Sequence, residues 1–374
     1  MRKIKRSSKP TYAFVLGTRP EIVKLSPLIR LFERLGRRFI LIHTGQHYSY
    51  EMDKLFFKEL CLPLPHHHLS LPSKVLGRQG EHTGRMMGAL ETVFMKESPD
   101  IVFVQGDTNS VLAASVVAAK LPTVRLAHVE AGLRSYDRLM PEEVNRILSD
   151  HVSDYLFAPT EGARKILRGE GIPDEKIFVT GNTIVDAVKQ NLAIAKKRRA
   201  TPRGPLSVRK PFFLLTLHRQ ENVDYFERFS AILQGLALVA REFKYPILFP
   251  MHPRTRRRLE EFNLRLPDGV RTLVPIGFLD FLRLEAETKL VLTDSGGVQE
   301  EACILGVPCV TFRTTTERPE TLTIGSNVLA GYEPKKILRC AQKMFGRKAT
   351  WKNPFGDGRA GERILNIVEK KARG

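Results

Sequence analysis

The chain has 374 residues, more than one ordinary domain holds, and 42% of them are hydrophobic while 27% are charged. This balance excludes a wholly disordered chain and favours about two globular domains. No apolar run approaches the roughly 20 residues that span a membrane, and the N-terminus lacks a signal-peptide pattern, so we expect a cytoplasmic protein without membrane contact. Its four cysteines stand alone in apolar surroundings, which favours buried free thiols.

The formal net charge of +20 raises the question of a nucleic-acid partner. Basic residues are spread along the chain, with small clusters at 2–9, 196–199 and 254–258. No helix-turn-helix, zinc finger or aromatic-interleaved basic patch accompanies them. We therefore expect no nucleic-acid partner, and an anionic small substrate accounts for the charge more simply.

In the first half, short apolar runs alternate with helical patterns such as Ile22–Leu35 and Val111–Lys120. Runs that are apolar on both faces and separated by helices indicate a parallel sheet covered on both sides. The predicted strands are Tyr12–Leu16, Phe39–His43, Ile101–Gln105, Thr123–Val129, Tyr155–Ala158 and Ile177–Thr180.

A basic stretch with two prolines and a glycine, residues 196–210, has the composition of a linker. A second α/β series follows, with predicted strands at Phe212–Thr216, Ile247–Pro250, Leu273–Pro275, Leu290–Leu292 and Val310–Phe312. We therefore predict two doubly wound α/β domains facing across a cleft, residues 1–185 and 211–357, joined by a hinge at 186–210.

Three acids follow predicted strand ends or open a helix: Asp107, Glu130 and Glu142. Each has a structural interpretation. Asp107 suits a helix cap, Glu130 suits an ion pair with Arg134 or Arg146, and Glu142 suits a helix N-terminus. Together they could supply carboxylates with separated pKa values for general acid–base chemistry at carbon.

In the second half of the chain, cations and glycines take the corresponding positions after predicted strands or before a helix. His218 follows a predicted strand, and a surface-loop histidine is the simpler interpretation. Ser295, Gly296 and Gly297 precede a helix predicted near Val298, which suits either an anion site or a plain helix cap. Further candidates for the same substrate are Glu301, Arg318, Arg19 and Lys24.

Several familiar motifs are missing from the chain. No G-x-G-x-x-G follows the first strand, and no Walker A, H-E-x-x-H or G-x-S-x-G motif occurs, so we expect no cofactor. The run 66–68 of three histidines is predicted to lie in a loop without nearby acids, so we expect no metal there either.

Eleven segments, in order from residue 17 to 358, resemble the non-hydrolysing UDP-N-acetylglucosamine 2-epimerases. They are GTRPEIVKLSPLI, TGQHY, QGDTNSVLA, HVEAGLRS, MPEEVNR, GNTIVDAV, TLHRQEN, HPRTR, TDSGGVQEEA, TTERPET and NPFGDG. The resemblance implies two Rossmann-like domains in the glycosyltransferase-B architecture, a homodimer, and a final helix, 358–374, that returns to the first domain.

The resemblance also implies a reaction and residue roles. UDP-N-acetylglucosamine would be inverted at C2 by elimination of UDP to a 2-acetamidoglucal and re-addition, in the synthesis of cell-surface polysaccharide precursors. Its motifs assign catalysis to Asp107, Glu130, Glu142 and His218. They assign the diphosphate to Arg19, Lys24, His218 and Arg318, UDP to Ser295, Gly296, Gly297 and Glu301, and the uracil to Phe278.

One segment departs from the family pattern. The link from Arg134 to Glu142 is short, while Gln46 and His47 belong to a motif associated with a regulatory pocket for a second UDP-N-acetylglucosamine. Whether a second UDP-N-acetylglucosamine molecule activates the protein therefore stays open. The alternatives to this function are a 2-epimerase of a related UDP-sugar, such as a UDP-diacetamido uronic acid, and a glycosyltransferase of the same architecture.

Overall fold

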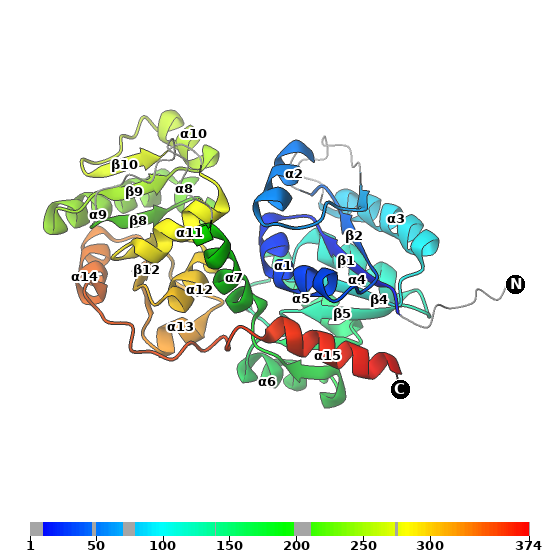
Figure 1. Ribbon diagram of the computed structural model, residues 1–374. Coiled ribbons are helices and arrows are strands. Elements are labelled where there is room, and N and C mark those ends of the chain that lie inside the picture. The colour runs from blue at the N-terminus through cyan, green and yellow to red at the C-terminus, as the bar shows by residue number, and fades with distance from the viewer. Residues whose placement is uncertain are drawn as a thin grey trace, which may run out of the picture. The chain divides into compact units, whose positions relative to one another are not determined.

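The computed structural model describes residues 10–46, 50–69, 79–138, 140–197, 211–273 and 276–373. The chain divides into two compact units (Figure 1). The first comprises Met1–Lys189 and Phe355–Gly374, and the second comprises Gln190–Pro354. Each unit holds a parallel sheet with helices in its strand connections, so the predicted α/β class with two doubly wound sheets is confirmed.

The first unit contains a seven-stranded sheet in the order β3-β2-β1-β4-β5-β6-β7. Its central strands are buried along their length because helices cover both faces. The strands are β1 (Tyr12–Leu16), β2 (Phe39–His43), β3 (His67–His68), β4 (Ile101–Gln105), β5 (Arg125–Val129), β6 (Tyr155–Ala158) and β7 (Ile177–Val179). The helices are α1 (Arg19–Arg34), α2 (Tyr50–Glu59), α3 (Gln79–Glu97), α4 (Asn109–Ala119), α5 (Pro141–Val152), α6 (Glu161–Gly169), α7 (Thr183–Lys197) and α15 (Ala360–Arg373).

The second unit contains a six-stranded sheet in the order β10-β9-β8-β11-β12-β13, again with parallel pairing. The strands are β8 (Phe213–Thr216), β9 (Ile247–Pro250), β10 (Val270–Leu273), β11 (Val291–Thr293), β12 (Cys309–Thr311) and β13 (Asn327–Leu329). The helices are α8 (Gln220–Val223), α9 (Phe226–Phe243), α10 (Pro253–Glu261), α11 (Phe278–Glu287), α12 (Gly296–Leu305), α13 (Pro319–Thr323) and α14 (Pro334–Met344).

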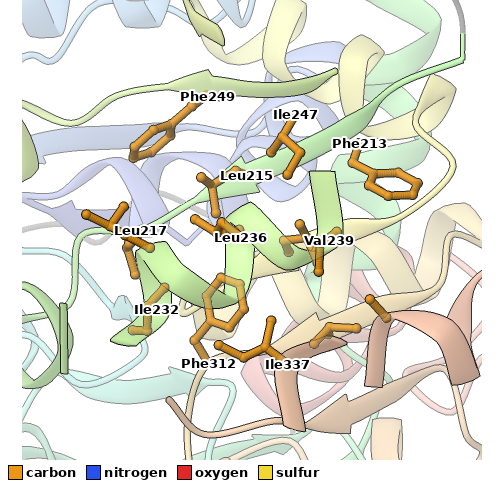
Figure 2. Close-up of a cluster of buried hydrophobic side chains, with 14 of the residues drawn as sticks. Phe213, Leu215, Leu217, Ile232, Leu236, Val239, Ile247, Phe249, Phe312 and Ile337 are labelled. Atoms are coloured by element: carbon orange, nitrogen blue, oxygen red, sulfur yellow. The ribbon is translucent and has the colours of Figure 1, made fainter. Parts of the chain in front are cut away.

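Each sheet is held by its own hydrophobic core. In the first unit Phe14 of β1 stacks on Phe103 of β4, with ring centroids 4.9 Å apart. In the second unit side chains of β8 and β9 pack against α9, and Ile337 brings α14 into the same cluster (Figure 2). These cores fix the sheets from which the candidate site residues project.

Helix α15 follows the second unit in sequence but packs against α1 of the first unit (Figure 1). The Asp186 carboxylate accepts hydrogen bonds from the backbone N–H groups of Ala360 and Gly361, at 3.2 and 3.1 Å. Helix α7 is continuous through residue 197, within the stretch predicted as hinge, and the rest of that stretch, 198–210, lies outside the described residues.

The structure corrects several predicted elements. The strand predicted at Leu273–Pro275 is found at Val270–Leu273, with residues 274 and 275 outside the described part. His67 and His68 form a short strand, and His67 contacts Glu97 at 3.0 Å, so the expectation of a loop without acids was wrong. All four cysteines are free, but Cys61 is exposed. Within the part of the chain described, every helix is too short or too polar to cross a bilayer.

Candidate functional site

The chain order of each sheet reverses at one point, between β1 and β4 in the first unit and between β8 and β11 in the second. Doubly wound proteins bind ligands beyond the carboxyl ends of the strands at such a switch point, because the helices that leave the two strands diverge there. Asp107 follows β4 directly, and Arg19 follows β1. His218 and Ser295 follow β8 and β11. The sequence candidates therefore include residues at both switch points.

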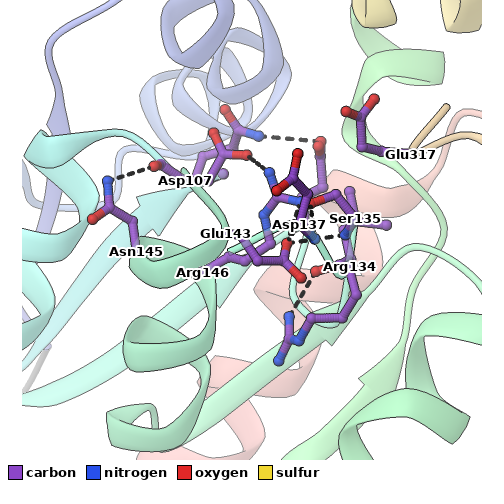
Figure 3. A network of polar contacts seen from close by, with 12 residues as sticks. Asp107, Arg134, Ser135, Asp137, Glu143, Asn145, Arg146 and Glu317 are labelled. Atoms are coloured by element: carbon purple, nitrogen blue, oxygen red, sulfur yellow. Dashed lines mark hydrogen bonds and ion pairs between the residues drawn. The ribbon is translucent and has the colours of Figure 1, made fainter. Parts of the chain in front are cut away.

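Asp107 lies in the turn between β4 and α4, which Gly106 opens with a φ of 81°. Its carboxylate accepts a hydrogen bond from Arg146 on α5, with Nη2 2.6 Å from Oδ2 (Figure 3). Its backbone carbonyl accepts from the Asn145 side chain at 2.9 Å. The N-cap of α4 is Thr108, so the capping interpretation of Asp107 was wrong and its half-exposed carboxylate is held by a cation instead.

Glu130 lies just beyond β5 in a left-handed backbone conformation, with a φ of 70°. A side chain other than glycine costs about 1–3 kcal/mol there, a strain that is characteristic of functional sites. Its buried carboxylate contacts Lys24 Nζ at 2.5 Å and accepts from Gln105 at 3.1 Å. Its cationic partner is therefore Lys24, rather than Arg134 or Arg146 as the structural interpretation of the sequence had it.

Helix α5 carries two consecutive acids with different surroundings. Glu142 is exposed, whereas Glu143 is buried and accepts hydrogen bonds from the backbone N–H groups of Ser135 and Tyr136, at 2.9 and 2.8 Å. Burial acts to raise the pKa of Glu143, but these hydrogen bonds and Arg146 outweigh it and hold the pKa below its usual range. Glu143 thus fixes the link that precedes α5, which leaves Glu142 as the acid with an exposed side chain.

His128 of β5 lies buried between the two turns that carry Asp107 and Glu130. One ring nitrogen is 2.7 Å from Asp150 and the other is 2.8 Å from the Gly106 carbonyl. A carbonyl oxygen and a carboxylate only accept, so both ring nitrogens carry a proton and the ring is a cation. Burial acts to lower the pKa of His128, but Asp150 and the other contacts outweigh it and the pKa is raised.

The remaining candidates of the first unit lie near the same turns. Arg19 is exposed, with its guanidinium 5.4 Å from the centre of the Phe56 ring. The Gln46 side-chain oxygen accepts from the backbone N–H of Ser110 at 3.0 Å, which ties the end of β2 to the start of α4. His47, the other predicted regulatory residue, lies outside the described residues.

His218 begins the turn after β8 and is organised by Asp294, a fully buried residue just beyond β11. The Asp294 carboxylate accepts from the backbone N–H groups of His218 and Arg219, at 3.0 and 2.8 Å, and from the Asn222 side chain at 3.3 Å. His218 Nδ1 lies 3.4 Å from the same carboxylate. His218 is therefore a half-exposed histidine with a fixed carboxylate partner, unlike a plain surface-loop residue.

Helix α12 begins at Gly296, two residues earlier than predicted. Its N-cap residue Ser295 makes no side-chain capping hydrogen bond in the described structure, so the plain-cap interpretation is not supported. A Cβ placed on Gly297 would meet no atom within 4 Å, and one on Gly296 would meet only ordinary contacts. Gly297 thus leaves room beside the first turn of this helix, where the helix dipole favours an anion.

Arg318 is held at this end of α12 by Glu300, with Nε 2.5 Å from Oε1 of the fully buried carboxylate. Glu301, one residue further, is nearly buried and lies against Glu285 of α11. Burial and the charge of Glu301 raise the pKa of Glu285 well above its usual range. Phe278, half-buried, is the first residue of α11.

Sequence reasoning missed the residues that orient the candidates, chiefly His128, Asp150, Asn145 and Asp294. Their partners lie 16 to 76 positions away along the chain, so no local spacing shows them. The available signal was their type: charged or polar side chains within apolar strands or beside strand ends need partners when buried. Among the described residues no group of His, Cys, Asp and Glu has the arrangement of a metal site.

The fold and these contacts define an α/β protein with two doubly wound units, one presenting carboxylates and the other a helix N-terminus with cations. A family model described as UDP-N-acetylglucosamine 2-epimerase matches residues 32–369. The chain belongs to this family of isomerases.

Three similar proteins illustrate the family. The UDP-N-acetylglucosamine 2-epimerase of Methanocaldococcus jannaschii is 52% identical over 362 residues, which is 95% of this chain and 98% of the relative. A crystal structure of that organism's enzyme in complex with UDP-GlcNAc and UDP has a TM-score of 0.89 and covers 96% of this chain and 99% of its own. The UDP-2,3-diacetamido-2,3-dideoxy-D-glucuronate 2-epimerase of Pseudomonas aeruginosa is 40% identical, covering 95% of this chain and 98% of the relative.

Proposed function

We propose that this chain catalyses the reversible C2 epimerisation of UDP-N-acetylglucosamine to UDP-N-acetylmannosamine. The observation that carries the proposal is the pair of carboxylates, Asp107 and Glu130, each fixed by a cation beside the switch point of the first sheet. Inversion at carbon needs groups that remove and return a proton, and held carboxylates are suited to that task.

In the first half-reaction the C1–O bond breaks, and its electron pair leaves with the β-phosphate of UDP. Positive charge that develops at C1 makes the C2 proton removable, so a carboxylate takes it and C1=C2 forms in a 2-acetamidoglucal. In the second half-reaction C2 receives a proton from the opposite face and the UDP oxygen returns to C1. One carboxylate in a fixed pose serves one face, so we assign the two faces to different acids among Asp107, Glu130 and Glu142.

We assign UDP chiefly to the second unit. The backbone N–H groups at Gly296 and Gly297, with the Ser295 hydroxyl beside them, suit a phosphate, and Arg318 adds a cation whose direction is set by Glu300. Glu301 is the candidate for the ribose hydroxyls and Phe278 for the uracil. Arg19, Lys24 and His218 would offset the charge that grows on the diphosphate as it leaves. The proposed reaction is redox-neutral and uses no cofactor.

The test is incubation with UDP-N-acetylglucosamine in heavy water, followed by proton NMR. We expect deuterium at C2 and signals of the manno epimer. Folded protein that leaves both the C2 proton and the UDP-sugar intact would refute the proposal. A parallel incubation with UDP-2,3-diacetamido-2,3-dideoxy-D-glucuronate, prompted by the 40% identical relative, separates the two substrates: faster exchange in that arm would replace the N-acetylglucosamine assignment.

We further propose a homodimer that acts in the cytoplasm on precursors of cell-surface polysaccharide. Its support is the family to which the chain belongs. Sedimentation velocity gives the mass directly, and a monomer of 42.4 kDa at assay concentration would refute the dimer. The regulatory role proposed for Gln46 and His47 is tested in the NMR exchange assay, with the rate measured against substrate concentration. Activation by a second substrate molecule gives a sigmoidal rate curve.

A further inference from the structure

Glu21, in the first turn of α1, contacts the two turns that meet at the switch point of the first sheet. It is 1% exposed. The backbone N–H of Gly17, directly after β1, donates to its Oε2 at 2.9 Å. The Thr108 hydroxyl, in the turn after β4, donates to its Oε1 at 2.8 Å. One buried carboxylate thereby joins the ends of two neighbouring strands.

Both ends of this bridge lead to candidate site residues. Thr108 directly follows Asp107, and its hydroxyl also accepts from the Val111 backbone N–H at 3.3 Å, which caps α4. Gly17 lies two residues before Arg19. The Gly17 turn is also closely packed, since a Cβ there would lie 2.0 Å from the Thr44 hydroxyl. A shift of the Glu21 side chain would therefore be transmitted to the backbone beside Asp107.

We propose that Glu21 is a positioning residue for Asp107. Its carboxylate holds the turn that carries Asp107 in a fixed position relative to the turn that carries Arg19. This inference rests on the proposed epimerase function, in which Asp107 acts on the substrate. A simpler role for Glu21 is that of an acid in the first turn of a helix, where the dipole favours negative charge. That role would affect folding stability without a specific effect on turnover.

The protonation state of Glu21 offers a way to tell these roles apart. Burial raises the pKa of Glu21 to about 7, against hydrogen bonds from Thr18, Gly17 and Thr108 that act to lower it. Two charged side chains on the same helix and in the Thr108 turn are engaged elsewhere, Lys24 by Glu130 and Asp107 by Arg146. Glu21 therefore changes charge within the pH range in which an enzyme is assayed.

The two protonation states hold the turns differently. Ionised Glu21 accepts both hydrogen bonds, and such charge-assisted bonds are stronger than neutral ones. Protonated Glu21 must still accept from Gly17 N–H, so its proton lies on Oε1 and the bond to the Thr108 hydroxyl reverses direction. We expect the tighter hold of the ionised form to raise kcat as pH increases through about 7.

The test compares four variants: E21A and T108V, which break the bridge, and E21Q and T108S, which keep groups able to form it. Rates of deuterium exchange at C2 are measured over a range of UDP-N-acetylglucosamine concentrations, and circular dichroism checks folding. We expect E21A and T108V to lose about 10- to 100-fold in kcat, with KM within about threefold, because a small misplacement of a catalytic group costs this much. T108S should recover most of the loss seen in T108V.

Each result bears on the inference. Wild-type protein without exchange would refute the epimerase function itself, whereas active wild type with an equally active E21A would refute only the positioning role. If E21A does not fold, T108V and T108S test the inference in its place, and equal kcat values in those two variants would refute it. In a pH series, the rise in kcat near 7 should be absent from E21Q; an unchanged rise would show that another group causes it.

Discussion

The two switch points are built alike, and the comparison shows how one topology serves two kinds of chemistry. In the first unit the buried Glu21 reaches from the turn after β1 to Thr108 after β4. In the second unit the buried Asp294 reaches from the turn after β11 to the backbone of His218 and Arg219 after β8. In both, a carboxylate joins the two turns at the reversal of strand order.

The ion pairs beside the two points orient groups of opposite charge. In the first unit the carboxylates of Asp107 and Glu130 are oriented by Arg146 and Lys24. In the second unit the cation of Arg318 is oriented by the buried Glu300. The first arrangement suits proton transfer at a sugar carbon, and the second suits an anion such as a diphosphate. Variants that change one unit at a time therefore separate proton transfer from diphosphate binding.

The largest effect is expected from D107N, which removes a carboxylate and keeps the shape of the side chain. General acid–base groups contribute about 10²- to 10⁴-fold to rate, so C2 exchange should fall by that factor. The affinity for UDP should stay within about threefold, because the residues assigned to UDP are chiefly in the second unit. Exchange is measured by NMR and UDP affinity by calorimetry.

The matched control for D107N is E161Q, which changes an exposed acid at the start of α6 in the same unit. It should leave both exchange and UDP affinity unchanged. If UDP affinity in D107N falls by the same factor as exchange, Asp107 has a structural or binding role, and the division of chemistry between the units is wrong.

The next effect concerns the Arg318–Glu300 pair of the second unit. R318M leaves the fully buried Glu300 without this cation, and removing one partner of a buried pair costs about 3–5 kcal/mol in the free energy of unfolding. The double variant R318M/E300Q should regain most of that stability, because the uncompensated charge is gone. Urea unfolding followed by circular dichroism measures both variants.

Binding separates the two roles of Arg318. Both R318M and the double variant should bind UDP about 10- to 100-fold more weakly, since a hydrogen bond to a charged group contributes roughly 1.5–3 kcal/mol. A stable double variant with wild-type UDP affinity would mean that Arg318 serves the fold alone.

Much of the fold could be predicted because the central strands are buried on both faces and appear as unbroken apolar runs. β1, β2 and β4 have the predicted bounds for this reason. The strands that were missed or shifted by two residues or more lie at the sheet edges, where fewer residues are buried. β3 consists of two histidines, and β10 has two polar residues, Arg271 and Thr272, between Val270 and Leu273. Their strand character comes from pairing with a neighbour, which the local sequence does not encode.

The candidate site was predictable in its residue types and less so in its contacts. Asp107 and Glu130 stood out as acids at strand ends, but the partner of Glu130 was Lys24, which is 106 positions away. Glu21 looked like an ordinary acid in a first helical turn, and its contact with Thr108 spans 87 positions. Such pairings follow from the order of strands in the sheet, so they become visible only once that order is known.

The pH dependence of stability should differ between the units. The pKa of Glu21 is raised from 4.5 to about 7, so its contribution is present below pH 4.5 and is lost as pH rises through 7. The pKa of Glu317 is lowered to about 2, because its bonds to Arg313 outweigh burial, so its contribution is present above pH 4.5 and is lost as pH falls towards 2. Each full loss is on the order of 3 kcal/mol.

Urea unfolding at pH 3, 5 and 8 tests both signs against matched variants. Between pH 5 and 8, wild type should lose stability relative to E21Q, which cannot ionise. Between pH 5 and 3, wild type should lose stability relative to E317Q. If the free energy of unfolding changed with pH equally in wild type and in a variant, the replaced glutamate would not have the shifted pKa that its surroundings indicate.

The smallest effect compares two threonines that cap helices of the first unit. Thr160 caps α6 through the Ala163 N–H at 3.2 Å, and Thr108 caps α4 through the Val111 N–H at 3.3 Å. Loss of such a cap costs about 1 kcal/mol in the free energy of unfolding, so T160A and T108A should lose comparable stability on this account. Only Thr108 also contacts Glu21, so T108A alone should slow C2 exchange, by about tenfold or more. If T160A slowed exchange equally, a general loss of stability in the first unit would explain the slower exchange, and the effect would not be specific to the switch point.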